Sequence, residues 1–212
     1  MPKKKSERDI FEDELLPLLY GKLKVASWRK KQGIFFCTKN EFFFEVDAGA
    51  HRLKDVSVAR IAAKPMSLDP AYWRIVDLEE NNNEPLSFRA WGAFTCSSIP
   101  IDSIEIPDSA KSPADISAEL SVAIERSTGH FAGNTTEKQF IDIVASNPNQ
   151  IERGSYAITY VMALYCAGEQ EKALEVATAY TTGERESSHA HNHLGENFHT
   201  IAVRHIQKEL SA

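Results

Sequence analysis

Histidines near the end of the chain are the residues best suited to chemistry. Five of the seven histidines lie between residues 189 and 205. On a helix, His189, His193 and Glu196 would be spaced i, i+4 and i+7, so their side chains would share one face. Neutral imidazole and carboxylate groups are suitable zinc ligands. One hypothesis is therefore a metal-binding protein or metal-dependent enzyme that holds zinc with His189, His193 and Glu196.

The same segment also has interpretations without a metal. Gly195 weakens a helix at this point, and residues 181–188 have the composition of a loop. A solvated loop, or a helix face near a protein partner, fits the same residues, and His191 and Phe198 are then predicted to bind that partner. Because histidine titrates near neutral pH, a pH-sensitive contact is a further alternative.

Basic and aromatic side chains alternate in a second segment, from Lys22 to Phe36. Interleaved cations and rings can bind single-stranded nucleic acid. However, residues 1–107 carry 16 lysines and arginines against 16 aspartates and glutamates, so this half has no net positive charge. We expect a solvated turn in front of aromatic core residues, and no nucleic-acid partner.

Nucleophilic catalysis finds no support in the sequence, which lacks a G-x-S-x-G elbow and a G-x-x-x-x-G-K-[ST] phosphate loop. Cys37, Cys96 and Cys166 lie far apart without a C-x-x-C pair, which predicts reduced thiols in a cytoplasmic protein. The four-residue spacing of Asp47 and His51 suits acid–base chemistry but is also typical of a polar turn. The sequence favours a protein that is not an enzyme, and no catalytic residue is predicted.

Charge and hydropathy limit the possible partners. Residues 108–212 carry 8 basic and 14 acidic residues and hold the whole net charge of −6. This acidity repels phosphate backbones and is compatible with a basic protein partner. The longest apolar run, residues 156–167, is too short to span a bilayer. The basic start of the chain has no apolar segment after it, so we expect a cytoplasmic protein without a membrane partner.

Residues 1–107 are expected to form one helix and an antiparallel sheet. Apolar periodicity predicts a helix over residues 6–20, which Pro17 interrupts. Alternating apolar and polar residues then predict a series of strands over 22–46, 56–61, 72–78 and 86–96. Arg89 and Trp91 would lie on the outer face of the last strand, so we predict that they contact a partner.

Residues 108–212 are expected to be helical. Ser112-Pro113-Ala114-Asp115 is a typical helix start, and Asn134-Thr135-Thr136-Glu137 is another. Two more helices are predicted on either side of Gly168, and a last one over residues 194–210.

The pair of helices around Gly168 resembles one tetratricopeptide-type hairpin. Tyr160 and Leu164 occupy inward positions of its first helix, and Ala173 and Ala177 are the small contacts of its second. This resemblance covers residues 156–182 and implies a peptide-binding helical surface. The alternative is an ordinary antiparallel helix pair packed on the sheet, because a single repeat cannot bury its own apolar face.

The order of elements resembles a group of small bacterial α+β proteins of unknown function, some of them immunity-like. The similarity lies in the helix Ile10 to Leu19, the basic turn Trp28 to Lys31, and the aromatic strands Ile34 to Cys37 and Phe42 to Val46. The resemblance implies protein binding rather than catalysis.

Together these patterns predict an α+β fold with an N-terminal helix, an antiparallel meander of about five to seven strands, and a C-terminal bundle of about four to five helices. Residues 1–107 and 108–212 form the two predicted regions. The alternative is a single domain in which the helical region packs on the sheet. The leading hypothesis is a cytoplasmic interaction module, immunity-like or an adaptor, that binds through the sheet face or the acidic helices. The alternatives are the zinc hypothesis and a structural subunit of a homo-oligomer.

Overall fold

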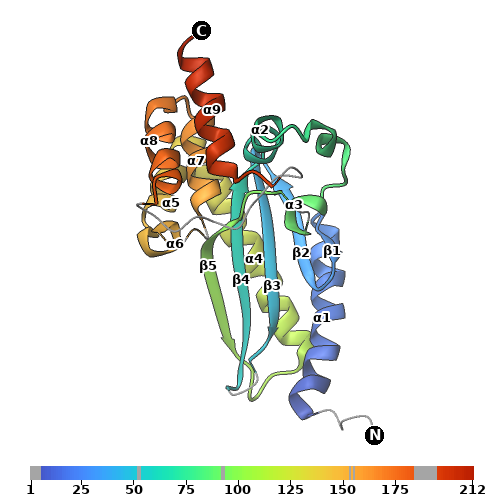
Figure 1. Ribbon diagram of the computed structural model, residues 1–212. Coiled ribbons are helices and arrows are strands. Elements are labelled where there is room, and N and C mark those ends of the chain that lie inside the picture. The colour runs from blue at the N-terminus through green and yellow to red at the C-terminus, as the bar shows by residue number, and fades with distance from the viewer. Residues whose placement is uncertain (1–5, 52–53, 92–93, 153, 155, 184–194) are drawn as a thin grey trace, which may run out of the picture. The chain divides into compact units, whose positions relative to one another are not determined.

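The computed structural model describes residues 6–51, 54–91, 94–152, 154, 156–183 and 195–212, with the side chain of Trp91 left out. It confirms the predicted α+β fold: an N-terminal helix, a five-stranded antiparallel sheet, then several helices (Figure 1). Two compact units are present, Met1–Ala63 with Pro100–Asn134 and Lys64–Ile99 with Thr135–Ala212. The division into 1–107 and 108–212 stays a prediction about domains. Within the described residues, no helix is both long and apolar enough to cross a membrane.

The sheet belongs mainly to the first unit, and its strands follow one another in sequence order. They are β1 (Arg29–Lys31), β2 (Ile34–Lys39), β3 (Phe42–Ala50), β4 (Val56–Pro65) and β5 (Ile99–Pro107). Gln32 and Gly33 have φ values of 51° and 90°, the backbone of a tight two-residue hairpin turn. This turn sets the register that pairs Lys30 with Phe35. A meander of this kind leaves β1 and β5 as the two edge strands.

Two helices of the first unit, α1 (Glu7–Val25) and α4 (Pro113–Asn134), pack against each other and against the sheet (Figure 1). The helix α1 extends beyond the predicted residue 20, so the strand predicted to begin at residue 22 is wrong there. The reason is the spacing of Leu15, Leu19 and Leu23, which are all fully buried and continue one helical stripe to the end of α1. Pro17 lies on the exposed side of this helix.

Aromatic side chains of β3 fill the core of the first unit on both faces of the strand. Phe42 and Phe44 meet the ring of Phe131 from α4 at centroid distances of 5.2 and 5.9 Å. Phe43 points to the other face and stacks on Phe36 at 6.2 Å. The three consecutive phenylalanines of β3 are therefore all buried, and the strand is covered on both faces.

The N-terminal turn of α1 is joined to the strands by a buried carboxylate. Arg8 donates two hydrogen bonds to Asp108, at 2.9 and 2.7 Å, and Ser57 donates a third at 2.6 Å. Burial acts to raise the pKa of Asp108, but these hydrogen bonds and the charge of Arg8 outweigh it and lower that pKa. Asp108 is therefore an ionised anchor between α1, β4 and the residue after β5.

The second unit is mostly helical. It contains α2 (Leu68–Ile75), the 3-10 helix η1 (Glu79–Asn83), α3 (Phe88–Trp91), α5 (Glu137–Ala145), α6 (Pro148–Glu152), α7 (Ala157–Cys166), α8 (Gln170–Thr181) and α9 (Phe198–Leu210). The predicted start at Thr136 is confirmed, because its side chain forms a capping box with Gln139. The predicted helix pair is also confirmed: α7 and α8 are in contact and are joined at Gly168, which has φ 80°.

Two predicted strands of the second unit are wrong. Residues 72–78 lie largely in α2, because Leu68, Ala71, Tyr72 and Ile75 follow a helical period and are buried together. Residues 86–96 contain the short helix α3 instead of a long strand. Trp73 donates a hydrogen bond from its indole nitrogen to the carbonyl of Phe94 at 2.6 Å, and this contact helps to hold the segment against α2.

Candidate functional site

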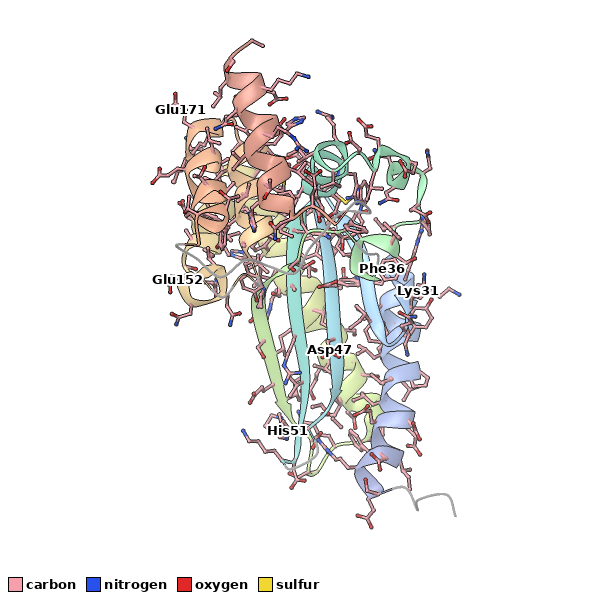
Figure 2. The ribbon with its side chains drawn as sticks, in the orientation of Figure 1. Lys31, Phe36, Asp47, His51, Glu152 and Glu171 are labelled. Carbon is pink, nitrogen blue, oxygen red and sulfur yellow. The ribbon has the colours of Figure 1, made fainter. Side chains whose placement is uncertain are left out.

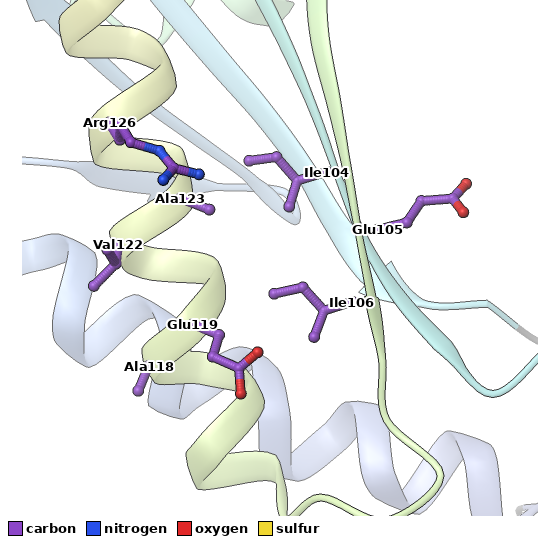
Figure 3. Close-up of a pocket in the computed structure, with 8 residues that line it drawn as sticks. All are labelled: Ile104, Glu105, Ile106, Ala118, Glu119, Val122, Ala123 and Arg126. Carbon is purple, nitrogen blue, oxygen red and sulfur yellow. The ribbon is translucent and has the colours of Figure 1, made fainter.

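A groove on the first unit lies between strand β5 and helix α4, with a volume of about 570 Å³. Figure 3 shows that the side chains lining it come from these two elements alone. They are Ile104, Glu105 and Ile106 from the strand, and Ala118, Glu119, Val122, Ala123 and Arg126 from the helix. We call this surface the β5–α4 groove.

Strand β5 forms one wall of the groove because it is an edge strand. Ile104 and Ile106 point toward α4, and Glu105 points away from it (Figure 3). The prolines Pro100 and Pro107 lie near the two ends of the strand, where a missing N–H is tolerated. The strand therefore offers two isoleucine side chains to the groove while one of its edges has no neighbouring strand.

Helix α4 forms the other wall, and its start explains which face it turns outward. Ser112 and Asp115 exchange capping hydrogen bonds, which fixes the first turn. Ile116, Leu120 and Ile124 then follow at helical spacing and are fully buried. Val122 lies outside that stripe and is 67% exposed. Complete burial of a valine-sized side chain is worth roughly 1.5–3 kcal/mol, and the exposed Val122 gains little of this stabilisation within the chain.

Two charged side chains of α4 border the groove, and only one of them has an ion-pair partner among the described residues. Glu119 accepts two hydrogen bonds from Lys111, both at 2.7 Å, across the exposed side of α4. Arg126, two turns further along α4, makes no ion pair with any residue that the structure describes. One end of the groove therefore carries an anion and the other carries an exposed cation.

The groove combines an apolar centre with charged edges. Its centre is apolar, from isoleucine, valine and alanine side chains, and its charges lie at the edges. That distribution is typical of protein–protein contact surfaces, which place apolar residues centrally and polar residues around them. No cysteine, serine or histidine lines the groove, and the side chains that do line it provide no nucleophile paired with a base.

The residues predicted to hold zinc are only partly described. His189 and His193, like His191 of the predicted contact set, lie outside the described residues. Glu196 forms an ion pair with Arg204, with N–O distances of 3.1 and 3.2 Å. Among the residues that the structure does place, no group of three or more potential ligands could hold a metal ion. The zinc hypothesis stays a prediction.

The other predicted contact residues lie in the second unit and are used internally there. Phe198 is 1% exposed, and its ring meets Tyr72 edge-on at 5.0 Å. Arg89 lies in α3, is 13% exposed, and pairs with Asp69 at 3.0 Å. Trp91 is the last residue of α3, and nothing further is described of its side chain. The outer strand face on which Arg89 and Trp91 were expected is not present, and their role in binding stays a prediction.

A buried charge network that sequence reasoning missed surrounds Asp69. Lys64 and Asp69 both have fully buried side chains and pair at 2.9 Å. Lys64 also donates to the carbonyls of Arg89 and Cys96, at 2.8 and 2.6 Å, and the N–H of Cys96 donates to Asp69 at 2.8 Å. Each charged group of this network therefore has a partner of opposite charge. The contacts connect β4, α2 and the segment before β5.

His199 is buried next to aromatic rings in the second unit. It lies in the first turn of α9 and stacks on Tyr180 at a centroid distance of 4.2 Å. Neither ring nitrogen has a hydrogen-bond partner among the described residues. Burial lowers the pKa of His199 to about 4, so the ring is neutral at physiological pH.

The three cysteines and the basic hairpin, which the sequence also offered for chemistry or binding, have structural roles in the described residues. Cys37, Cys96 and Cys166 are free, and burial raises the pKa of Cys37 to about 12 and that of Cys166 to about 11. Such thiols stay protonated and are poor nucleophiles. In the basic hairpin, Trp28 is buried and donates to Glu125, so its ring is not an exposed stacking platform.

The polar segment from Asp47 to His51 borders a smaller cleft of about 210 Å³ at one end of the sheet (Figure 2). Asp47 faces Arg60 at 3.5 Å, and both side chains are largely exposed. Glu12 closes the cleft by accepting a hydrogen bond from the N–H of Ala50 at 3.0 Å. A Cβ at Gly49 would come within 3.2 Å of this carboxylate, which explains a glycine at that position. Asp47 and His51 therefore lie at or beside the end of strand β3, where Glu12 of helix α1 contacts that strand.

No family model matches the chain, and no curated protein and no solved structure is significantly similar to it. The resemblances to tetratricopeptide hairpins and to immunity-like proteins stay predictions.

Proposed function

We propose that the protein is an interaction module that binds a protein partner through the β5–α4 groove. The exposure of Val122 carries this proposal. A large apolar side chain that is 67% exposed beside an apolar groove is the arrangement expected where a partner covers the surface. The edge position of β5 supports it, because only one side of that strand has a neighbour in the sheet.

The net negative charge of residues 108–212 plays a secondary part in this proposal. Glu152 and Glu171 lie on exposed parts of α6 and α8 (Figure 2), within the second unit. Exposed acids of this kind influence the rate and salt dependence of association more than its affinity. The apolar groove, not the acidic helices, is therefore the surface to test first.

A photo-crosslinking amino acid at position 122 tests the proposal inside cells that express the whole chain. The matched control places the same amino acid at Val25, which is 88% exposed at the end of α1 and lies outside the groove. We expect a discrete cross-linked product from position 122 and none from position 25. No product from position 122, or the same products from both positions, would contradict the proposed function.

A further inference from the structure

The surface that carries the groove also carries an exposed apolar side chain on its border. Val122 projects from α4 at the border of the groove, and the apolar centre formed by Ile104, Ile106 and Ala123 lies beside it. An exposed apolar side chain on such a border can meet its own counterpart when two copies associate about a twofold axis, because each copy then contributes the same surface. Such a contact closes on itself and does not continue into a filament.

We propose that the partner in the β5–α4 groove is a second copy of this chain, with the two α4 helices antiparallel and crossing at Val122 and Ala123. This inference rests on the proposed function, since it names the partner of the same groove. The two Val122 side chains then meet each other at this crossing, on the border of both grooves. Both copies remove the exposed apolar side chain of Val122 from water, and burial of apolar surface is the main driving force for such association.

The charges along α4 match an antiparallel partner. Glu119 and Arg126 lie equally far from the midpoint between Val122 and Ala123, on opposite sides of it. In an antiparallel pair, Glu119 of each copy therefore faces Arg126 of the other. The carboxylate of Glu119, which accepts two hydrogen bonds from Lys111 of its own chain, is then shared by the two cations. A parallel pair would place like charges together. Exposed ion pairs add little affinity, but they select orientation and register.

Small residues on the outward side of α4 support the close approach of another helix. Gly129 and Gly133 lie inside the helix, where glycine is less stable than alanine by up to about 1 kcal/mol. A Cβ at either position would meet no atom within 4 Å, so packing among the described residues does not require a glycine there. With the helices antiparallel, the start of the second copy's α4 passes over Gly129, where a bare backbone leaves room for it.

Pairing of the β5 edges is a weaker alternative for the same two copies. Pro100 and Pro107 remove backbone N–H donors near both ends of β5. Asp102 and Glu105 are exposed on the same strand, and self-pairing would bring these acids of the two copies together. The contact we propose therefore runs through α4 and the groove and not through an extended sheet.

The mass of the whole chain in solution, measured by sedimentation over a range of concentrations, tests the second-copy contact. We expect a dimer, about tenfold weaker dimerisation for either Glu119→Arg or Arg126→Glu, and affinity within about threefold of the original for the double variant. Val122→Asp should be monomeric, and the control Val25→Asp should dimerise normally. Circular dichroism of each variant shows that it is folded.

Three results would overturn this inference: a monomer at every concentration, a dimer that Val122→Asp leaves intact, or a double variant that dimerises as weakly as the single variants.

The photo-crosslink at position 122 separates this inference from the proposed function. A product of twice the chain mass supports both, whereas a product with a different protein overturns the second copy and leaves the proposed function standing. No product at all contradicts both.

Discussion

The buried network around Asp69 and the β5–α4 groove use charge in opposite ways. In the second unit, Lys64, Asp69 and Arg89 satisfy one another and nearby carbonyls away from water. In the first unit, Arg126 remains exposed beside a valine that the core does not use. Charges that are already satisfied hold a fold together, and charges that remain exposed next to apolar surface are available to a partner. Substitutions in the two regions should therefore differ in effect, from a large loss of stability at Asp69 to almost none at Val122.

Replacing Asp69 should cause the largest loss of stability. Asp69→Ala leaves Lys64 buried without its anion, and removing one partner of a buried pair typically costs about 3–5 kcal/mol. Urea denaturation measures the change in the free energy of unfolding. The matched control is Asp47→Ala, because Asp47 and Arg60 form an exposed pair and should contribute less than about 1 kcal/mol. Equal effects of the two substitutions would show that the buried pair stabilises the fold no more than the exposed pair does.

His199 should make the protein less stable in mild acid. Its pKa of about 4 in the folded state lies below the value of 6.5 expected when it is unfolded, so the unfolded chain binds the proton more readily. This contribution is complete above pH 6.5 and is lost as the pH falls toward 4, by roughly 3 kcal/mol in total.

The variant His199→Phe separates this effect from the titration of carboxylates. It keeps an aromatic ring beside Tyr180 and removes the titrating group. We expect the free energy of unfolding of the original chain to fall more steeply than that of the variant between pH 6.5 and pH 4. Parallel pH profiles for the two proteins would show that His199 does not titrate in this range.

Asp108→Asn should have an intermediate effect. An amide keeps the shape of the side chain but loses the charge that Arg8 contacts, and a hydrogen bond to a charged group is worth about 1.5–3 kcal/mol. The loss should disappear at acidic pH, because the lowered pKa of Asp108 means that its stabilisation exists only while the carboxyl is ionised. Thermal unfolding at neutral and acidic pH measures this, and a loss that does not change with pH would contradict it.

Val122→Ser should have the smallest effect on the stability of the single chain. Because Val122 is mostly exposed and outside the core stripe, its substitution should alter the free energy of unfolding by no more than about 0.5 kcal/mol at concentrations too low for dimers. The same variant should bind the second copy more weakly. A large loss of stability in the dilute protein would mean that Val122 is part of the core.

The sequence predicted those elements whose signals are local. Ser112, Asp115 and Thr136 cap their helices through contacts within a few residues, so the starts of α4 and α5 were predictable. The helix α2 was mistaken for a strand because Trp73 and Ile75 suit either structure over a short stretch. Contacts of Trp73 with Phe94 and of Asp69 with Cys96, more than twenty residues away, accompany the helical arrangement.

The candidate site could be predicted only in part. Val122 stands out in the sequence as an apolar residue off the stripe of Ile116, Leu120 and Ile124, and that signal could have suggested an outward apolar surface. The other wall was not predictable in the same way. Asp102 and Ser103 interrupt the alternation of apolar residues in β5, and its position beside α4 depends on the order of the whole sheet.

Disulfide trapping at the proposed twofold axis is the most direct test of the central claim. Val122→Cys should form a disulfide-linked dimer under mild oxidation, because the two copies of residue 122 meet where the helices cross. Val25→Cys, at a position that is 88% exposed against 67% for Val122, and the original chain with its three cysteines report random collisions and should form no disulfide-linked dimer. Linkage at position 122 alone is the result we predict. Equal linkage at both positions, or none at position 122, would contradict the account.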